Sequence, residues 1–281
     1  MNKILQVPLV RIIIATLFVG VGVAIGQVAL NLLRSALSVT DTGVANLLAF
    51  LLVTPTAYFA YWMYVHFLER RELTELRGAT ALREFGLGSL TGFGLFSFVM
   101  ATLWLLGFYR VSGSNIVLLS LLGALAGAFV SAFAQELIFR AVVYRITEEW
   151  LGTWWAVAIS ALLFGFIHLS SAGATLFSAA AVALQAGILL AAAYALTHRL
   201  WLALGLHTLW DFANDGVFGV AGQSGYSLRG VLQASLQGPG LFTGGTFGVE
   251  ASIVSVVIVL IAGIFMLWKV RQRGLAVSST K

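Results

Sequence analysis

The chain has 281 residues, of which 60% are apolar and only 10% are charged, and its mean hydropathy is +0.97. A soluble domain has about 45–50% apolar and about 25% charged residues, so this composition excludes a soluble enzyme or a disordered chain and requires lipid around much of the surface. The absence of cysteine excludes disulfides, thiolate catalysis and Cys-based zinc sites. We attribute the net charge of +5 to loop orientation in a membrane and expect no nucleic-acid partner.

Eight stretches are long and apolar enough to cross a bilayer, which takes roughly 20 mainly apolar residues. They lie near 10–33, 44–67, 86–108, 116–134, 154–169, 178–197, 203–220 and 251–268. The first is too long for a signal peptide and no small-x-small cleavage site follows it, so we expect it to be retained. The stretch 135–150 continues the fourth span as a more polar helix. The sequence therefore predicts an all-α polytopic membrane protein, with residues 1–281 as one transmembrane domain.

The distribution of basic residues predicts the orientation. If both termini are cytoplasmic, 13 of the 16 Lys and Arg lie on the cytoplasmic side, and only Arg34, Arg110 and Arg229 lie outside. We expect this arrangement, in the plasma membrane. The inner loop 69–84 alternates acids and bases, which predicts a solvated interfacial helix. The outer segment 216–250 holds ten of the 30 glycines and is expected to be irregular. Three pairs of small residues predict close helix contacts: Gly22/Gly26, Gly88/Gly92 and Gly123/Gly127.

Ionisable residues inside hydrocarbon cost at least about 2.5 kcal/mol each, and here they concentrate in the segment 135–215. Glu136 and Arg140 are four residues apart, so they share a helix face and can pair. One interpretation is a structural ion pair that neutralises two charges in lipid. The other is functional: Arg140 keeps Glu136 ionised and oriented as a general base.

The next polar residues stand at matching depths. Glu136 and His168 each lie 16 residues from Gly152, the centre of a polar turn. In an antiparallel helix hairpin both would be roughly 24 Å from that turn, which predicts a carboxylate opposite an imidazole. His207 and Asp211, again four apart, share one face of the following helix. Four polar groups on three helices are thus expected to converge.

The order Glu-x-x-x-Arg, Phe-x-x-x-His and His-x-x-x-Asn/Asp in eight apolar spans resembles the CAAX-protease and bacteriocin-processing (CPBP) family of intramembrane proteases. The resemblance rests on residues 135–211 and is closest at Phe139-Arg140 and at Phe164-Gly-x-x-His168. It implies a polar cavity open to the cytosol, with Glu136 as the base and His168 as its partner. His207 and Asp211 would form the side that stabilises the oxyanion or helps to hold a metal. The resemblance assigns supporting roles to three further residues: Gln135, Arg140 and Phe164.

Two positions depart from the family pattern. The family usually has two adjacent glutamates, and the first is Gln135 here. Because glutamine cannot take a proton, either the base is Glu136 or the protein is inactive. Asp211 stands where several members have Asn, and an ionised Asp would repel an oxyanion. Asp211 therefore suits metal ligation or orientation of His207 better, and it would have to be protonated to donate to the oxyanion itself.

The sequence is compatible with a metal-dependent site and with a metal-free site. Two His and one or two carboxylates can hold a divalent ion such as zinc with an open water position, and the possible ligands are Glu136, His168, His207 and Asp211. The same groups can also work without metal, through general-base catalysis, and no cofactor is certain.

The leading hypothesis is an endopeptidase that cleaves a membrane-associated or lipidated protein or peptide near the cytoplasmic face. The first alternative is a catalytically inactive relative that acts as a membrane immunity, scaffold or regulatory protein. The second is a proton-coupled transporter, for which the sequence shows no inverted repeat.

Overall fold

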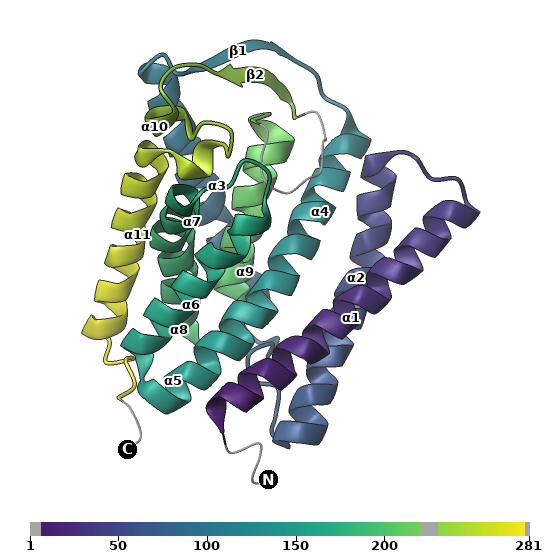
Figure 1. Cartoon of the computed structure of the whole chain (residues 1–281), viewed down its shortest axis with the longest axis vertical. Helices are drawn as coiled ribbons and strands as arrows, with labels where there is room; N and C mark the ends of the chain where they lie inside the picture. The colour runs from purple at the N-terminus through teal and green to yellow at the C-terminus, as the bar shows by residue number, and fades with distance from the viewer. Residues whose placement is uncertain (1–6, 221–229, 279–281) are drawn as a thin grey trace.

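The computed structural model describes residues 7–220 and 230–278 as a bundle of long helices (Figure 1). Within these residues, seven helical segments are long and apolar enough to cross a membrane. They are Pro8–Ala36 (α1), Thr42–Glu69 (α2, Thr42–Met63, with a π-helical end), Ala81–Leu105 (α3), Leu118–Leu151 (α4 and α5), Thr153–Ser170 (α6 and a 3-10 turn), Leu176–Thr197 (α7 and α8) and Ile253–Gln272 (α11). The predicted all-α polytopic membrane fold is confirmed.

The fourth span is one continuous helical segment, as expected. It consists of α4 (Leu118–Glu136), a π-helical segment (Leu137–Tyr144) and α5 (Arg145–Leu151). Gly152, with φ of 85°, then reverses the chain into α6 (Thr153–Ile167). A left-handed conformation of this kind favours glycine, which has no Cβ to clash. The predicted antiparallel hairpin is therefore present.

The seventh expected span, near 203–220, is helical but is not among these seven segments. It is α9 (Leu200–Phe212), continued by a π-helical turn (Ala213–Val217). α9 packs against α3, α4 and α8 (Ile188–Thr197), and most of its residues are buried. Protein surrounds this helix, so it can carry polar side chains that a lipid-facing helix could not.

Glycines bring α9 close to α3. A Cβ at Gly92 would collide with the carbonyl group of Leu206, and a Cβ at Gly88 would collide with that of Leu202. The other predicted glycine pairs make similar contacts, Gly22/Gly26 with α2 and Gly123/Gly127 with the start of α2. All three predicted small-residue contacts are confirmed, and one of them fixes the position of the helix that carries His207.

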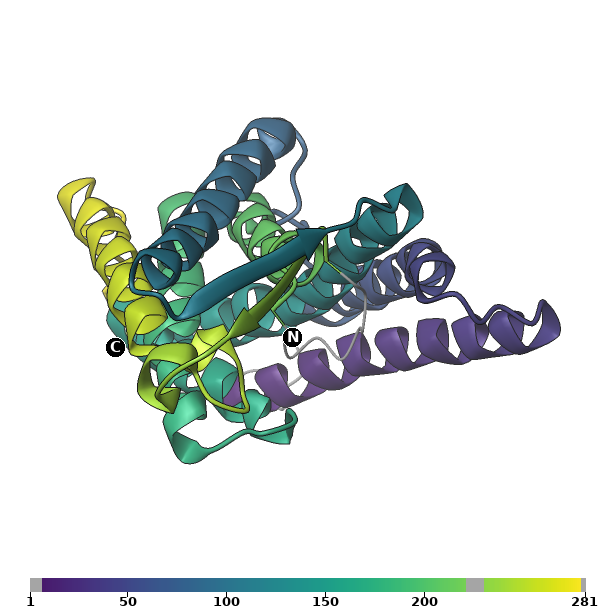
Figure 2. The same ribbon diagram turned by 90° about the horizontal axis from the view of Figure 1, so that it is seen from above.

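A two-stranded ribbon crosses over one end of the bundle (Figure 2). β1 (Tyr109–Ser114) pairs antiparallel with β2 (Leu232–Leu236), and Tyr109 lies opposite Leu236. The outer segment 216–250 is thus less irregular than predicted: apart from residues 221–229, which lie outside the described residues, it holds β2, the short helix α10 (Gly240–Thr243) and the first two residues of a 3-10 turn (Val249–Ala251). Both chain termini lie at the opposite end (Figure 1).

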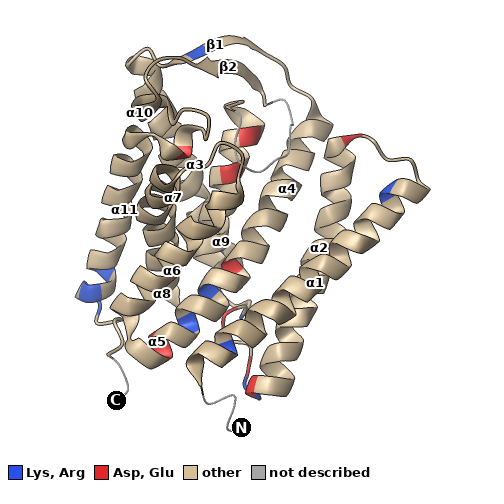
Figure 3. Cartoon of the chain, viewed as in Figure 1, with Lys and Arg blue, Asp and Glu red and all other residues tan. Residues whose placement is uncertain are grey.

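Most Lys and Arg in Figure 3 also lie toward the end of the bundle that holds the termini, with blue positions at β1 and at the far end of α1 as the exceptions. This distribution is the one that the predicted orientation requires. The orientation itself, with both termini in the cytoplasm, stays a prediction.

The expectation of a solvated helix over 69–84 is wrong. The chain between Arg70 and Thr80 forms turns and extended segments, and Glu75 is buried, with 1% of its side chain exposed. Glu75 accepts hydrogen bonds from Arg71 at 2.5 Å and from the Tyr61 hydroxyl at 2.8 Å, and its carboxylate lies 3.0 Å from Arg145 Nε. The loop is not helical because its Glu75 side chain turns inward and compensates the charge of the buried Arg145. The Glu75 cluster consists of Tyr61, Glu69, Arg71, Glu75 and Arg145.

Candidate functional site

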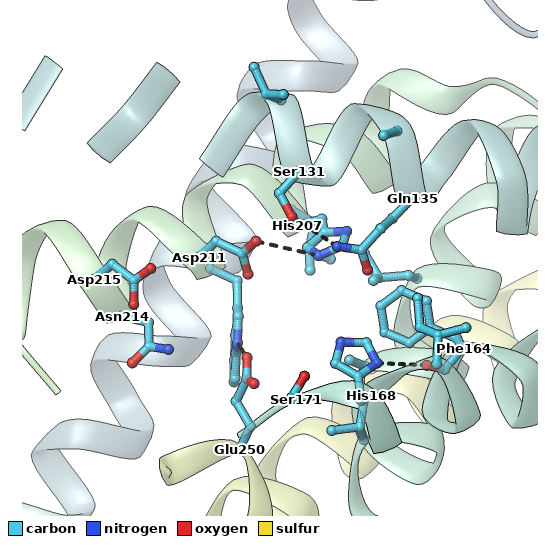
Figure 4. A pocket seen from close by; sticks show the side chains of 18 of the residues that line it. Ser131, Gln135, Phe164, His168, Ser171, His207, Asp211, Asn214, Asp215 and Glu250 are labelled. Carbon is cyan, nitrogen blue, oxygen red and sulfur yellow. Dashed lines mark hydrogen bonds and ion pairs between the residues drawn. The ribbon is translucent and has the colours of Figure 1, made fainter. Parts of the chain in front are cut away.

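A polar cavity of about 360 Å³ lies between the helices. Its wall includes residues of α1, α2, α4, α6, α8 and α9, together with the turn before α11. Figure 4 shows the polar side chains around its open centre. Of the seven residues singled out in the sequence, five line this cavity: Gln135, Phe164, His168, His207 and Asp211. Glu136 and Arg140 are not part of the lining and lie fully buried behind it.

His207 joins two carboxylates. Its Nδ1 lies 2.9 Å from Glu136 Oε1 and its Nε2 lies 3.6 Å from Asp211 Oδ2. The second contact follows from the four-residue spacing on α9, as predicted. The first joins α9 to the end of α4, and it gives Glu136 a histidine partner other than the expected one.

Glu136 and Arg140 form the predicted ion pair. Arg140 Nε lies 3.3 Å from Glu136 Oε2, and both side chains are 0% exposed. Arg140 Nη2 also donates to the Gly187 carbonyl at 3.3 Å, and its guanidinium lies 4.6 Å from the centre of the Phe164 ring. The attraction between a cation and an aromatic face is stronger away from water than at an exposed site. The pair lies where α4 changes to π-helix, a local geometry that is frequent at functional sites.

His168 stands at the end of α6, where the 3-10 turn His168–Ser170 begins. Its Nδ1 lies 2.7 Å from the Phe164 carbonyl oxygen. Because a carbonyl can only accept, Nδ1 carries the hydrogen, and the neutral ring has its lone pair on Nε2. In Figure 4 this second nitrogen faces the open centre of the cavity. His168 can therefore accept a proton from a molecule bound there.

Phe164 lies among these groups. Its ring centre is 4.9 Å from that of His168 and 5.7 Å from that of His207. The hairpin thus brings Glu136 and His168 to the same region, as their equal distance from Gly152 predicts. The carboxylate is bonded to His207, and the Phe164 ring contacts both histidines.

Gln135 occupies the cavity-facing position at the end of α4. Its side-chain amide donates to Ser131 Oγ at 2.9 Å, and its Oε1 is buried without a hydrogen-bond partner. Ser131 and Gln135 are four residues apart and share the helix face that lines the cavity. Glu136, one position further, points to another face. The position at which this chain has glutamine and the family usually has glutamate is therefore the one that faces the cavity.

The structure adds cavity residues that the sequence motifs did not identify as central. Asn214 and Asp215, which follow Asp211 in the sequence, both line the cavity. Glu250 lines it as well, and Trp210 Nε1 donates to its carboxylate at 2.9 Å. The only signal for Glu250 in the sequence is its position just before the last span, because no motif spacing connects it to the histidines.

A divalent metal does not fit the side chains as they stand. Within residues 7–220 and 230–278, no three His, Asp or Glu side chains converge closely enough to hold an ion. Both nitrogens of His207 face carboxylates, and Glu136 lies behind the cavity wall. The possible metal site at Glu136, His168, His207 and Asp211 stays a prediction.

The fold and the site define a multi-pass membrane protein with a histidine- and carboxylate-lined cavity enclosed by its helices. Residues 116–213, about a third of the chain, match the family model described as type II CAAX prenyl endopeptidase Rce1-like. The resemblance to the CAAX-protease family is thereby confirmed over the segment that contains all seven predicted site residues. No curated protein and no solved structure matches the chain. At the level of the family, this match supports a CAAX-type intramembrane protease.

The cavity lies closer to the strand-bearing end of the bundle than to the end with the termini. The Gly152 turn is at the end with the termini, since Thr153 Oγ1 accepts a hydrogen bond from Val277 N. His168 follows one complete helix, roughly 24 Å away, and Glu250 stands at the start of α11, whose other end leads to the C-terminus. The cavity and the termini thus lie toward opposite ends of the bundle, and the predictions of cytoplasmic termini and of a site near the cytoplasmic face both stay predictions.

Proposed function

We propose that this chain is an intramembrane endopeptidase of the plasma membrane that hydrolyses a peptide bond of a membrane-associated or lipidated substrate. The observation that supports the proposal is the cavity-facing Nε2 of His168, which is available to a water molecule opposite the His207–Asp211 pair. The scissile bond would lie near the membrane face next to the β1–β2 ribbon, because the cavity is closest to that end.

The proposed reaction starts with a water held against His168. His168 Nε2 takes one proton from this water as the oxygen attacks the carbonyl carbon, and later gives it to the leaving amine. His207, whose Nδ1 is bonded to Glu136, would direct its Nε2–H from the 3.6 Å contact with Asp211 to the oxygen that gains negative charge. An ionised Asp211 would repel that oxygen, so its role in this proposal is to hold the ring of His207.

Glu136 acts through His207 in this proposal. The assignment of Glu136 as the base stays a prediction, but its Oε1 is bonded to His207 and its side chain does not reach the cavity. We therefore infer that Glu136 positions His207 and that Arg140 balances its charge. A buried carboxylate bonded to an imidazole fixes the orientation of that ring, as in other catalytic constellations.

The test uses the purified full chain in proteoliposomes with a membrane-anchored fluorogenic peptide, with and without a lipid group. His168→Ala is expected to lower kcat at least about 100-fold, the low end of the usual effect of a general base. His66→Ala is the matched control, because His66 is an exposed residue at the end of α2 that stacks on Trp62. Cleavage that persists in His168→Ala, or a wild-type protein that releases no product, would contradict the proposal.

A further inference from the structure

Glu250 enters the cavity from outside the segment that matches the protease family. It belongs to the 3-10 turn Val249–Ala251, directly before α11, whereas the match ends at residue 213. In Figure 4, Glu250 and His168 border the same open centre, with His207 and Asp211 across from them. Glu250 and His168 both line this cavity.

One hydrogen bond holds the Glu250 carboxylate, and two further hydrogen bonds fix the backbone of its turn. Trp210 Nε1 donates to Oε1 at 2.9 Å. The side-chain amide of Gln185 donates to the backbone carbonyl of Glu250, and Ser255 Oγ in turn donates to Gln185 Oε1 at 2.6 Å. The neighbours Val249 and Ala251 are buried. The turn therefore presents this carboxylate to the cavity from a fixed backbone.

The other acidic groups are less suited to contact a water at His168. Gln135, at the cavity-facing end of α4, carries no charge, and Glu136 is bonded to His207 behind the wall. Asp211 faces His207 Nε2 at 3.6 Å. Figure 4 shows Asp215 beside Asn214, beyond Asp211 as seen from His168.

We propose that Glu250 is a catalytic residue that holds the attacking water against His168 and stabilises the positive charge which His168 gains. This inference rests on the proposed hydrolysis. One hydrogen of the water passes to His168 Nε2 and then to the leaving amine as the C–N bond breaks. The other hydrogen, directed by Glu250, stays on the new carboxylic acid, so the two products together contain the atoms of one water.

The first experiment compares Glu250→Gln with the wild-type protein in the proteoliposome assay. The variant keeps the size of the side chain and an oxygen that can accept from Trp210, but it loses the negative charge. We expect kcat to fall about 10- to 100-fold with KM within about twofold, because the lost interaction acts in the transition state. We also expect the acidic limb of the pH profile of kcat to change. Glu72→Gln, at an 81% exposed carboxylate, is the matched control.

The second experiment separates catalysis from support of the fold. Glu250→Ala opens space beside Trp210, and added formate is expected to restore part of the lost kcat, while it leaves Glu250→Gln unchanged. A structural role would instead lower the thermal unfolding midpoint and give no rescue. If the wild-type protein cleaves the peptide and Glu250→Gln keeps its kcat and pH profile, the role of Glu250 is wrong and the proposed function stands. If the wild-type protein releases no product, both are wrong.

Discussion

His207 Nδ1 lies 2.9 Å from Glu136 Oε1, although the two residues are 71 positions apart on different helices. Through this contact, the buried Glu136–Arg140 ion pair holds the imidazole ring of His207 in place. It also joins α4 and α9 at the level of the cavity, so a change at Glu136 affects both the fold and the proposed reaction.

The Glu136–Arg140 pair gives the first prediction. Glu136→Gln leaves the charge of Arg140 buried without compensation and is expected to cost about 3–5 kcal/mol of stability. The double variant Glu136→Gln/Arg140→Met removes both charges and should recover most of the unfolding midpoint. It should not recover kcat, because His207 still lacks its carboxylate partner. Thermal unfolding in detergent and the peptide assay measure the two effects, and a double variant with wild-type kcat would contradict the role given to Glu136.

The second prediction concerns Gln135, which faces the cavity where the family usually has glutamate. If Glu250 and His168 handle the water, Gln135→Glu should change kcat/KM by less than about fivefold, or about 1 kcal/mol. A protein that is inactive until Gln135→Glu creates activity would instead be the catalytically inactive relative. The measurement is turnover of the anchored peptide, with Gln135→Ala as the companion variant that removes the bond to Ser131.

The third prediction is a pH dependence of stability. Burial opposes the charged form of Glu75, but its hydrogen bonds to Arg71 and the charges of Arg145 and Arg71 outweigh burial and lower its pKa. The stabilisation is therefore complete above the unfolded-state pKa of about 4.3 and is lost as the pH falls through the lower folded-state pKa. Glu75→Gln should lower stability by about 3 kcal/mol at pH 7.

The difference between Glu75→Gln and the wild-type protein should shrink steadily below about pH 4. Unfolding midpoints measured from pH 7 to pH 3 check this, and Glu72→Gln should show no comparable trend because Glu72 is exposed. A constant difference over the whole range would show that the charge of Glu75 does not stabilise the loop.

The fourth prediction uses the close contact between α3 and α9. Gly92→Ala places a Cβ against the Leu206 carbonyl group, so α9 must shift and His207 must move with it. We expect a loss of about 1–3 kcal/mol from overpacking and a clear fall in kcat. Gly94→Ala, on the same helix but with open space around it, should be neutral or slightly stabilising. Equal effects of the two substitutions would show that the close approach is unimportant.

The fifth prediction concerns orientation. The chain has no cysteine, so single introduced cysteines can be labelled without background. With cytoplasmic termini, a membrane-impermeant thiol reagent should label Ser112→Cys in β1 on intact cells and Glu72→Cys only after permeabilisation. The opposite pattern would contradict the predicted orientation and would place the cavity near the cytoplasmic face.

The sequence is sufficient for the membrane class, the hairpin at Gly152 and the glycine contacts, because these depend on hydropathy, spacing and residue size. It is also sufficient for the i,i+4 pairs of the site. Which histidine meets Glu136 depends on how α9 packs against α4, which no local pattern encodes. Glu250 is inaccessible to motif analysis for the same reason, since only the tertiary fold brings the start of α11 to His168.

In the loop 69–84, the local sequence pattern predicts a helix that the structure does not contain. Its alternating charges are typical of a solvated helix, and the local pattern contains nothing that contradicts this. The helix is absent because Arg145, from a distant segment, takes Glu69 and Glu75 as partners in the interior. A long-range demand for charge compensation overrides the local preference.

The π-helical segment Leu137–Tyr144 stands between Gln135 at the cavity and Arg145 in the Glu75 cluster. Successive residues are turned by about 100° in an α-helix and by less in a wider π-helix, so the length and type of this segment set the angle between the two side chains. Deleting one residue from it would swing Arg145 away from Glu75 while Gln135 kept its place. The relative orientation of Gln135 and Arg145 thus depends on the number of residues between them. Single substitutions keep that number and would not reveal the effect, whereas a deletion would.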